Sequence, residues 1–341
     1  MSLRTAPRAV ATLDIGHTEP GTISQNWLHI INNGLGEPVR VPILVGRGRH
    51  DGPVLGLTAA VHGDELNGIP VIQRLFGALD LADLRGTVVG VLAMNVPGLL
   101  LGQRVFNDGE DLNHLAPGKP NGTESQVYLH RLLDRIVSRF THLIDLHTAS
   151  AGRVNSFYVR ADMDHPVASR MARLHTPQII VRNPPNDATV RGAAAALGIP
   201  AITCELRDPS RFQEDVVDAG LQGIRNVMGD LGMQDTEVFR PLLDTVVCEG
   251  SYWLYTDEGG ILEVLPEVTD FVEKDQVVAD VRTIFGEVTR RYVAPEAGVV
   301  IGRSINPINQ TGSRILHLGR NPQRIPSLLE EDILRAARTK P

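Results

Sequence analysis

Apolar runs alternate with amphipathic stretches over the first two thirds of the chain. Consecutive apolar positions predict buried strands over residues 54–61, 87–94, 141–146 and 199–206. Apolar residues at helical spacing predict helices over 69–79, 125–140, 188–197 and 216–231. This order predicts an α/β domain with a mixed, mostly parallel sheet that is flanked by helices.

The remaining segments of this part carry weaker patterns. Residues 1–20 suggest an irregular N-terminal arm, and 22–45 a β-hairpin that turns at Asn33-Gly34. Further short strands are predicted at 156–160 and 178–182. The stretch 95–123 is rich in Gly, Pro, Asn and Asp and is predicted as a long functional loop.

The pattern changes near residue 245, where helical periodicity stops. Short β-like runs follow at 251–255, 260–264, 277–283, 288–293 and 298–301. We therefore predict a catalytic domain over 1–245 and a small all-β domain over 246–322. Residues 323–341 form the tail, in which Ser327 and Glu330 have the spacing of a capping box for a helix over 327–338.

Composition narrows the class of protein. The net charge is −7 and no run of five Lys or Arg occurs, which argues against a nucleic-acid partner. Two cysteines are too few for a disulfide framework or a cysteine-rich zinc site. The absence of a signal-like or membrane-length apolar run leads us to expect a cytoplasmic protein with no membrane association.

Polar residues stand at the ends of three predicted strands. His62 and Glu65 follow the first, while His147 ends the strand at 141–146. Carboxyl ends of parallel strands share one edge of a sheet, where ligands bind. Two histidines and a glutamate are a known ligand set for catalytic zinc. The alternative is that His62 and Glu65 pair by chance and His147 is a hydrogen-bonded core histidine.

A fourth polar residue, Glu205, interrupts the apolar strand at 199–206. A buried carboxylate is costly without a purpose, and here it is a candidate general base. The alternative is a salt bridge with Arg207 or another arginine. In the long loop, Arg104 is suited to binding a carboxylate, and Asn113 to orienting either a carboxylate or the scissile carbonyl. The alternative is that both are solvated loop residues.

At these residues the chain resembles the succinylglutamate desuccinylase/aspartoacylase family, a branch of the zinc carboxypeptidase-like fold. The resemblance runs in order over about residues 50–230. It rests on Ala60-Val61-His62-Gly63-Asp64-Glu65-Leu66-Asn67-Gly68, Asn95-Val96-Pro97, Asp111-Leu112-Asn113, Asp145-Leu146-His147-Thr148 and Gly198-Ile199-Pro200-Ala201-Ile202-Thr203-Cys204-Glu205.

The resemblance implies one zinc per chain, held by His62, Glu65 and His147, with Glu205 as general base and Arg104 and Asn113 on the substrate. It implies a deacylase that cleaves the amide of an N-acyl amino acid or a related small N-acylated amine. Two departures imply a changed specificity pocket. His114 stands where the family usually has arginine, which makes Arg191 a candidate for the missing charge, and Arg207 stands where relatives often have glycine.

The C-terminal segment resembles a lipoyl/biotinyl-type β domain. Its two halves are 271–279 and 294–300, and no lysine lies between Val277 and Val300 to carry a cofactor. We expect it to shape access to the site.

Two alternative functions stay open. One is a carboxypeptidase-like metallopeptidase, and the other is a catalytically inactive metal-binding relative. A small N-acylated molecule is the expected partner, and the sequence leaves a homo-oligomer open.

Overall fold

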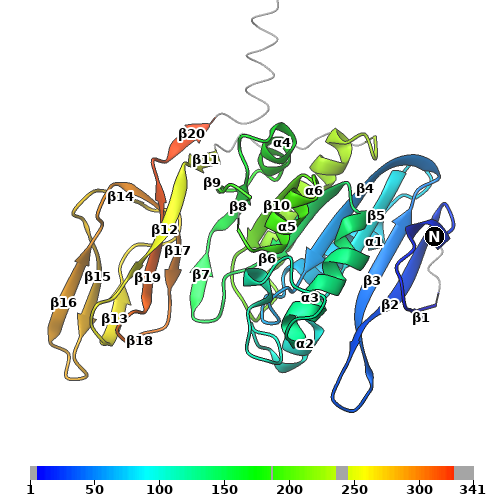
Figure 1. Ribbon diagram of the computed structural model, residues 1–341. Helices are drawn as coiled ribbons and strands as arrows, with labels where there is room; N and C mark the ends of the chain where they lie inside the picture. The colour runs from blue at the N-terminus through cyan, green and yellow to red at the C-terminus, as the bar shows by residue number, and fades with distance from the viewer. Residues whose placement is uncertain (1–5, 186, 236–244, 326–341) are drawn as a thin grey trace, which may run out of the picture.

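An eleven-stranded mixed sheet forms the centre of the protein in a computed structural model that describes residues 6–185, 187–235 and 245–325 (Figure 1). The strands in spatial order are β1 (Arg8–Val10), β2 (Thr22–Asn32), β3 (Pro38–Arg47), β5 (Arg85–Val91), β4 (His50–Ala59), β6 (His142–His147), β10 (Ala201–Leu206), β8 (Phe157–Ala161), β9 (Ile179–Arg182), β11 (Thr245–Cys248) and β20 (Gln323–Ile325).

The middle of this sheet is parallel. β5, β4, β6 and β10 run in one direction, and antiparallel pairing begins outside them, where β3 meets β5 and β8 meets β10. The predicted mixed, mostly parallel sheet is therefore confirmed. Its consequence for function is that β4, β6 and β10 end at the same edge.

Helices cover both faces, as the sequence pattern predicts. One core contains apolar residues of α1 (Gly68–Ala78), α4 (Pro166–Leu174) and α6 (Glu214–Asp230). The other contains those of α3 (Glu124–Arg135) and α5 (Val190–Ala196). Fully buried strands such as β6 contribute to both cores, with Leu146 in the first and Leu143 in the second.

Several elements were not predicted from the sequence, among them α2 (Val96–Leu101), α4 and β1. The stretch expected to be a loop contains α2, where the Asn95 side chain accepts the amide hydrogen of Gly98. A helix of this length shows no hydrophobic period, so its cap is its main local signal. Helix α4 was also missed. The expected irregular arm contains β1, which is ordered by pairing with β2.

The C-terminal strands form two smaller sheets. One contains β12 (Gly250–Tyr255), β19 (Arg314–Arg320), β17 (Gly298–Ser304) and β14 (Phe271–Val272), and the other β16 (Val288–Val293), β15 (Val277–Arg282), β13 (Gly260–Val264) and β18 (Ile308–Asn309). Their common core includes Val281, Val300 and Leu316. β7 (Arg153–Asn155) comes from the first part of the chain and pairs with β17, so it joins the two parts.

The chain leaves the large sheet through β11 and returns through β20. The domain boundaries at 246 and 323 stay predictions, as do the carboxypeptidase-like and lipoyl/biotinyl-like descriptions. The helix expected at 327–338 lies outside the described residues. Short 3-10 turns complete the fold at Ile15–His17, Leu112–His114 and Val137–Arg139. Among the described helices, none has the length and apolar character needed to cross a membrane.

Candidate active site

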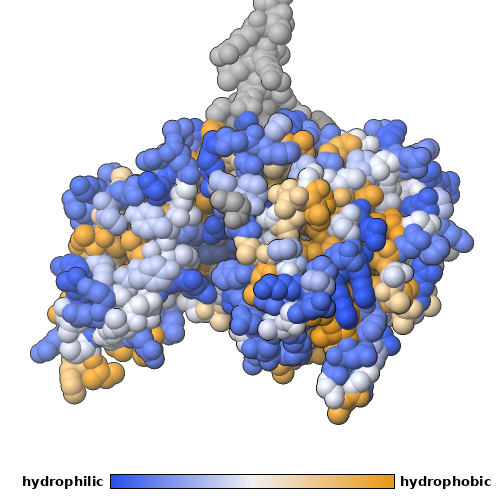
Figure 2. All heavy atoms as spheres, viewed as in Figure 1, coloured by the Kyte–Doolittle hydropathy of each residue, from blue (hydrophilic) through white to orange (hydrophobic). Residues whose placement is uncertain are grey.

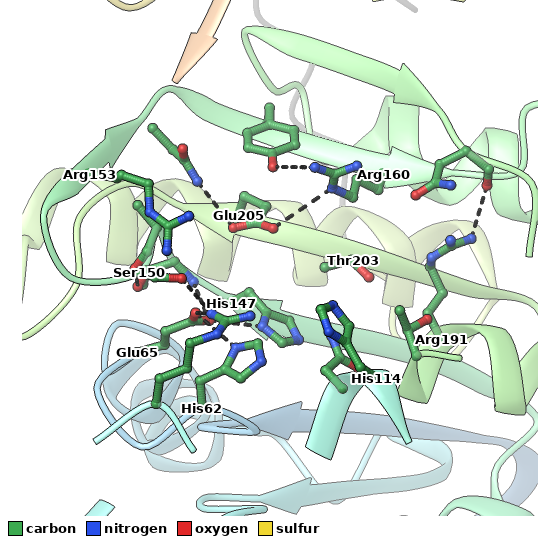
Figure 3. A pocket seen from close by; sticks show the side chains of 18 of the residues that line it. His62, Glu65, His114, His147, Ser150, Arg153, Arg160, Arg191, Thr203 and Glu205 are labelled. Atoms are coloured by element: carbon green, nitrogen blue, oxygen red, sulfur yellow. Dashed lines mark hydrogen bonds and ion pairs between the residues drawn. The ribbon is translucent and has the colours of Figure 1, made fainter. Parts of the chain in front are cut away.

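A pocket of about 420 Å³ opens where the large sheet meets the C-terminal strands. Figure 2 shows a hollow with hydrophilic side chains between these two parts of the molecule. All eight candidate residues of the sequence analysis line this pocket, and most are labelled in Figure 3: His62, Glu65, Arg104, Asn113, His114, His147, Arg191 and Glu205. Their roles stay predictions, whereas their common location is a structural result.

Three of these side chains converge on one point. The Nδ1 atom of His62 lies 2.8 Å from Oε1 of Glu65, and Nδ1 of His147 lies 2.8 Å from Oε2 of the same carboxylate. One nitrogen or oxygen from each of the three residues lies within 4.8 Å of the others. The imidazole rings are 5.1 Å apart between centroids. A single ion could therefore be held by all three.

The turn after β4 delivers two of these residues. Ala60 has a φ of 50°, in the left-handed region, which turns the chain sharply away from the strand. Gly63 packs against helix α2, and a Cβ atom there would lie 2.0 Å from the carbonyl carbon of Gly98. Only glycine fits this approach without displacing backbone. The turn thereby brings His62 and Glu65 to the carboxyl end of β6.

Carboxylates behind the histidines orient their rings. Nε2 of His147 donates a 2.8 Å hydrogen bond to Oδ2 of Asp145, whose Oδ1 accepts a 2.6 Å bond from the Thr58 hydroxyl. Nε2 of His62 donates to Oδ1 of Asp111 at 3.0 Å. With Nε2 occupied in both rings, the Nδ1 atoms face Glu65. This is the arrangement by which carboxylates hold metal-binding histidines.

The donor set fits a zinc ion. His62, Glu65 and His147 are all at most 3% exposed, and Nδ1 of His62 is buried without a hydrogen-bond partner among the described residues. Two imidazole nitrogens and one carboxylate leave the fourth tetrahedral position open, as in catalytic zinc sites. Burial favours a protonated Glu65, but the nearby His62 and His147 outweigh it and lower the pKa of Glu65. The carboxylate is therefore the ionised form that a metal requires.

Glu205 lies beside this cluster on the neighbouring strand. It is paired in register with His147, and its Oε2 accepts a 3.3 Å hydrogen bond from the Asn155 side chain. Arg160 is its nearest basic partner, with 3.9 Å between Nε and Oε1. Burial raises the pKa of Glu205, an effect that the positive charge of His147 opposes. A raised pKa favours a carboxylate that both accepts and returns a proton.

Arg207, the alternative salt-bridge partner that the sequence offered for Glu205, forms its ion pair elsewhere in the structure. Its side chain pairs with Asp215 of α6 instead. Its φ of 59° lies in the left-handed region, where glycine is unstrained. Glycine would therefore be the less strained residue at this position.

Arg104 is bound tightly at the edge of the cluster. Its guanidinium donates to Oε1 of Glu65 at 2.9 Å, to Asp111 at 3.0 Å and to the Ser150 hydroxyl at 2.5 Å. With these partners it balances the negative charge next to the two histidines. A substrate carboxylate would have to share the guanidinium with them.

The other three candidates line the far wall. The Asn113 side chain accepts the amide hydrogen of Val190 at 2.8 Å, while the His114 side chain is 73% exposed. Arg191 is 1% exposed, and its guanidinium donates to Asp187 at 2.6 Å and to the carbonyl oxygen of Asn183 at 3.0 Å. Arg191 therefore anchors the loop before α5.

Several residues of the site were not selected from the sequence. Asp145 had a usable signal, because it lies two residues before His147 in an apolar strand and so faces the same side. Arg160 occupies a short strand with a weak pattern. Arg153, Trp253 and Arg314 come from β7, β12 and β19, and no local pattern connects them.

Comparison with known proteins independently supports the family resemblance found in the sequence. The sequence model described as "Succinylglutamate desuccinylase/Aspartoacylase catalytic domain" matches residues 51–231, more than half of the chain. A curated relative, N-alpha-acetyl-L-2,4-diaminobutyric acid deacetylase of Halomonas elongata, is 27% identical over 270 residues. That alignment covers 75% of this chain and 77% of the relative.

Solved structures share the fold. The product-bound ectoine utilization protein EutE (DoeB) of Ruegeria pomeroyi superposes with a TM-score of 0.80 at 20% identity, covering 88% of this chain and 95% of that protein. A succinylglutamate desuccinylase of Silicibacter sp. TM1040 gives a TM-score of 0.78 at 20% identity, with 87% and 94% covered. The catalytic-domain match, together with this shared fold, leads to one conclusion: the chain belongs to the succinylglutamate desuccinylase/aspartoacylase family.

Proposed function

We propose that this protein is a zinc-dependent deacylase that hydrolyses the amide bond of an N-acyl amino acid or a related small N-acylated amine. The observation that carries the proposal is the convergence of His62, Glu65 and His147 within 4.8 Å, beside the half-buried Glu205. Family membership and the deacetylase relative support the reaction type. The expected location is the cytoplasm.

In this proposal His62, Glu65 and His147 hold zinc. When bound there, zinc polarises the acyl carbonyl and makes water more acidic. Glu205 takes a proton from the attacking water and returns it to the leaving amine nitrogen. Asn155 of β7 and Arg160 of β8 keep the Glu205 carboxylate in place.

The walls of the pocket favour a small substrate. Trp253 and Arg314, from the C-terminal strands, also line the pocket. A long peptide would have to pass these side chains, so the deacylase is preferred over a metallopeptidase. Retention of Glu205 next to the cluster argues against an inactive metal-binding relative.

A zinc assay combined with an amine-release assay tests the proposal. Purified protein should contain about one zinc per chain and release free amine from one or more members of a panel of N-acetyl, N-succinyl and N-formyl amino acids. Cleavage of dipeptides but no acyl amino acids would support the metallopeptidase. Stoichiometric zinc without hydrolysis of either panel would support the inactive relative.

A further inference from the structure

Two arginines of the pocket have no acidic partner in the part of the chain that the structure describes. Arg153 of β7 and Arg314 of β19 line it, and neither forms an ion pair or a side-chain hydrogen bond with any residue that the structure describes. The other three arginines of the pocket differ in this respect. Arg104 pairs with Glu65 and Asp111, Arg160 with Glu205, and Arg191 with Asp187.

An aromatic ring positions these two free guanidinium groups. The Cζ atoms of Arg153 and Arg314 lie 5.7 and 5.4 Å from the ring centroid of Trp253. Trp253 is itself stacked on His317, with 5.0 Å between centroids and 9° between planes. His317 is fixed by a 2.8 Å hydrogen bond to Ser251. Trp253 therefore holds both guanidinium groups in place, although the two arginines come from separate parts of the chain.

The two positive charges are close enough to affect each other. Burial lowers the pKa of Arg153, and the charge of Arg314 is the next cause. Burial and the neighbouring arginines also keep the pKa of His317 well below its usual value, so this imidazole stays neutral. Like charges brought together without a counterion are unfavourable, and an anion between them removes that cost.

The charges of the residues that line the pocket also favour an anionic ligand. Five arginines but only three carboxylates line it, Glu65, Asp187 and Glu205, so the lining carries a net charge of +2 in a chain whose net charge is −7. A positively charged cleft in an acidic protein attracts anions selectively. This net positive charge does not come from His114, whose side chain is largely exposed, or from Arg191, which is paired with Asp187.

We propose that Arg153 and Arg314 form an anion-binding site that receives the free carboxylate of the substrate, and that they determine specificity for anionic N-acyl amino acids. This inference rests on the proposed deacylase function and names the substrate class. Planar guanidinium groups bind carboxylates through paired hydrogen bonds. The site is built from β7 and β19, so the C-terminal strands take part in substrate recognition.

Paired substrates test the assignment. N-acetyl-L-2,4-diaminobutyrate and other N-acetyl-L-amino acids would each be compared with the corresponding α-carboxamide, which lacks the negative charge. The variants are Arg153→Gln and Arg314→Gln, with Arg153→Lys as the conservative change. Arg290→Gln is the matched control, because Arg290 also lies over an aromatic ring of the C-terminal sheets, 5.8 Å from that of Tyr292, and is not part of the pocket lining.

We expect each glutamine variant to lower kcat/KM for the carboxylate substrate roughly tenfold or more, mainly through a higher KM. The kcat/KM for the carboxamide substrate should change little. Arg153→Lys should recover part of the loss, and Arg290→Gln should behave as wild type. If the ratio of kcat/KM for the carboxylate to kcat/KM for the carboxamide is unchanged in both glutamine variants, the anion site is rejected and the deacylase proposal stands.

A binding measurement separates this proposal from the function itself. Calorimetry on the metal-free protein, with the same N-acetyl amino acids and carboxamides, should show tighter binding of the carboxylates in wild type but not in the glutamine variants. If no substrate is hydrolysed but this preference is found, the deacylase proposal fails and the anion site stands. If wild type binds both forms equally, the anion site is rejected.

Discussion

Glu205 and His147 are direct partners in the register of β10 and β6. Residues opposite each other on neighbouring strands point to the same face, so the candidate base and a candidate metal ligand share one side of the sheet. The relationship depends on backbone pairing and not on a flexible loop. The positions of both groups are thus determined by two paired strands inside the large sheet.

Replacement of the candidate base gives the first prediction. Glu205→Gln keeps the shape of the side chain but cannot accept a proton, so kcat should fall by roughly 10²- to 10⁴-fold while zinc content stays at the wild-type level. Steady-state amine release and metal analysis measure the two quantities. The exposed Glu214→Gln on α6 is the control. Near-normal turnover in Glu205→Gln would remove this residue from the role of base.

Loss of a ligand gives the second prediction. His147→Ala should reduce zinc occupancy sharply, because two of three protein ligands cannot hold the ion tightly. His142→Ala is a matched control, since His142 begins the strand that His147 ends. Metal content after dialysis, together with circular dichroism to verify folding, provides the comparison. Equal occupancy in the two variants would exclude His147 from the ligand set.

The carboxylate behind His147 gives the third prediction. Asp145→Asn keeps a hydrogen-bond acceptor for Nε2 of His147 but removes its negative charge. Zinc affinity should fall roughly 10- to 100-fold, as measured by competition with a chelator. Asp218→Asn, an exposed change on α6, should leave the affinity unchanged. The same affinity in both variants would show that Asp145 does not support the site.

A buried histidine far from the metal cluster gives a prediction for pH. His175 is fully buried, its Nε2 atom has no partner among the described residues, and burial lowers its pKa from 6.5 to about 4. Between these values the unfolded chain binds a proton that the folded chain does not. The resulting stability is complete above pH 6.5 and is lost as the pH falls toward 4, by roughly 3 kcal/mol.

Denaturant unfolding at several pH values measures this effect. His175→Gln should be less stable than wild type at pH 7, and the difference should shrink as the pH falls to 4. His50→Gln, at an exposed histidine, is the control. If the difference in the free energy of unfolding between His175→Gln and wild type does not change with pH, protonation of His175 is not the cause of acid sensitivity.

Part of this picture was predictable from the chain alone. Largely apolar runs precede His62, His147 and Glu205, so each residue could be placed at a strand end before any coordinates were known. Because parallel strands end at one edge, that placement also predicted that the residues meet. The family resemblance added their roles. Short elements such as α2 escaped prediction because six residues show no period.

The sequence by itself therefore determined the parallel centre of the sheet, most of the helices on its two faces and the candidate metal cluster, since each depends on local patterns and on strand direction. Only the tertiary structure decided the wall of the pocket that contains Arg153, Trp253 and Arg314. Arg153 and Arg314 meet at Trp253 because β7 pairs with β17 and brings the C-terminal sheets over the site. That packing joins residues far apart in the chain, and no periodicity or spacing encodes such a contact.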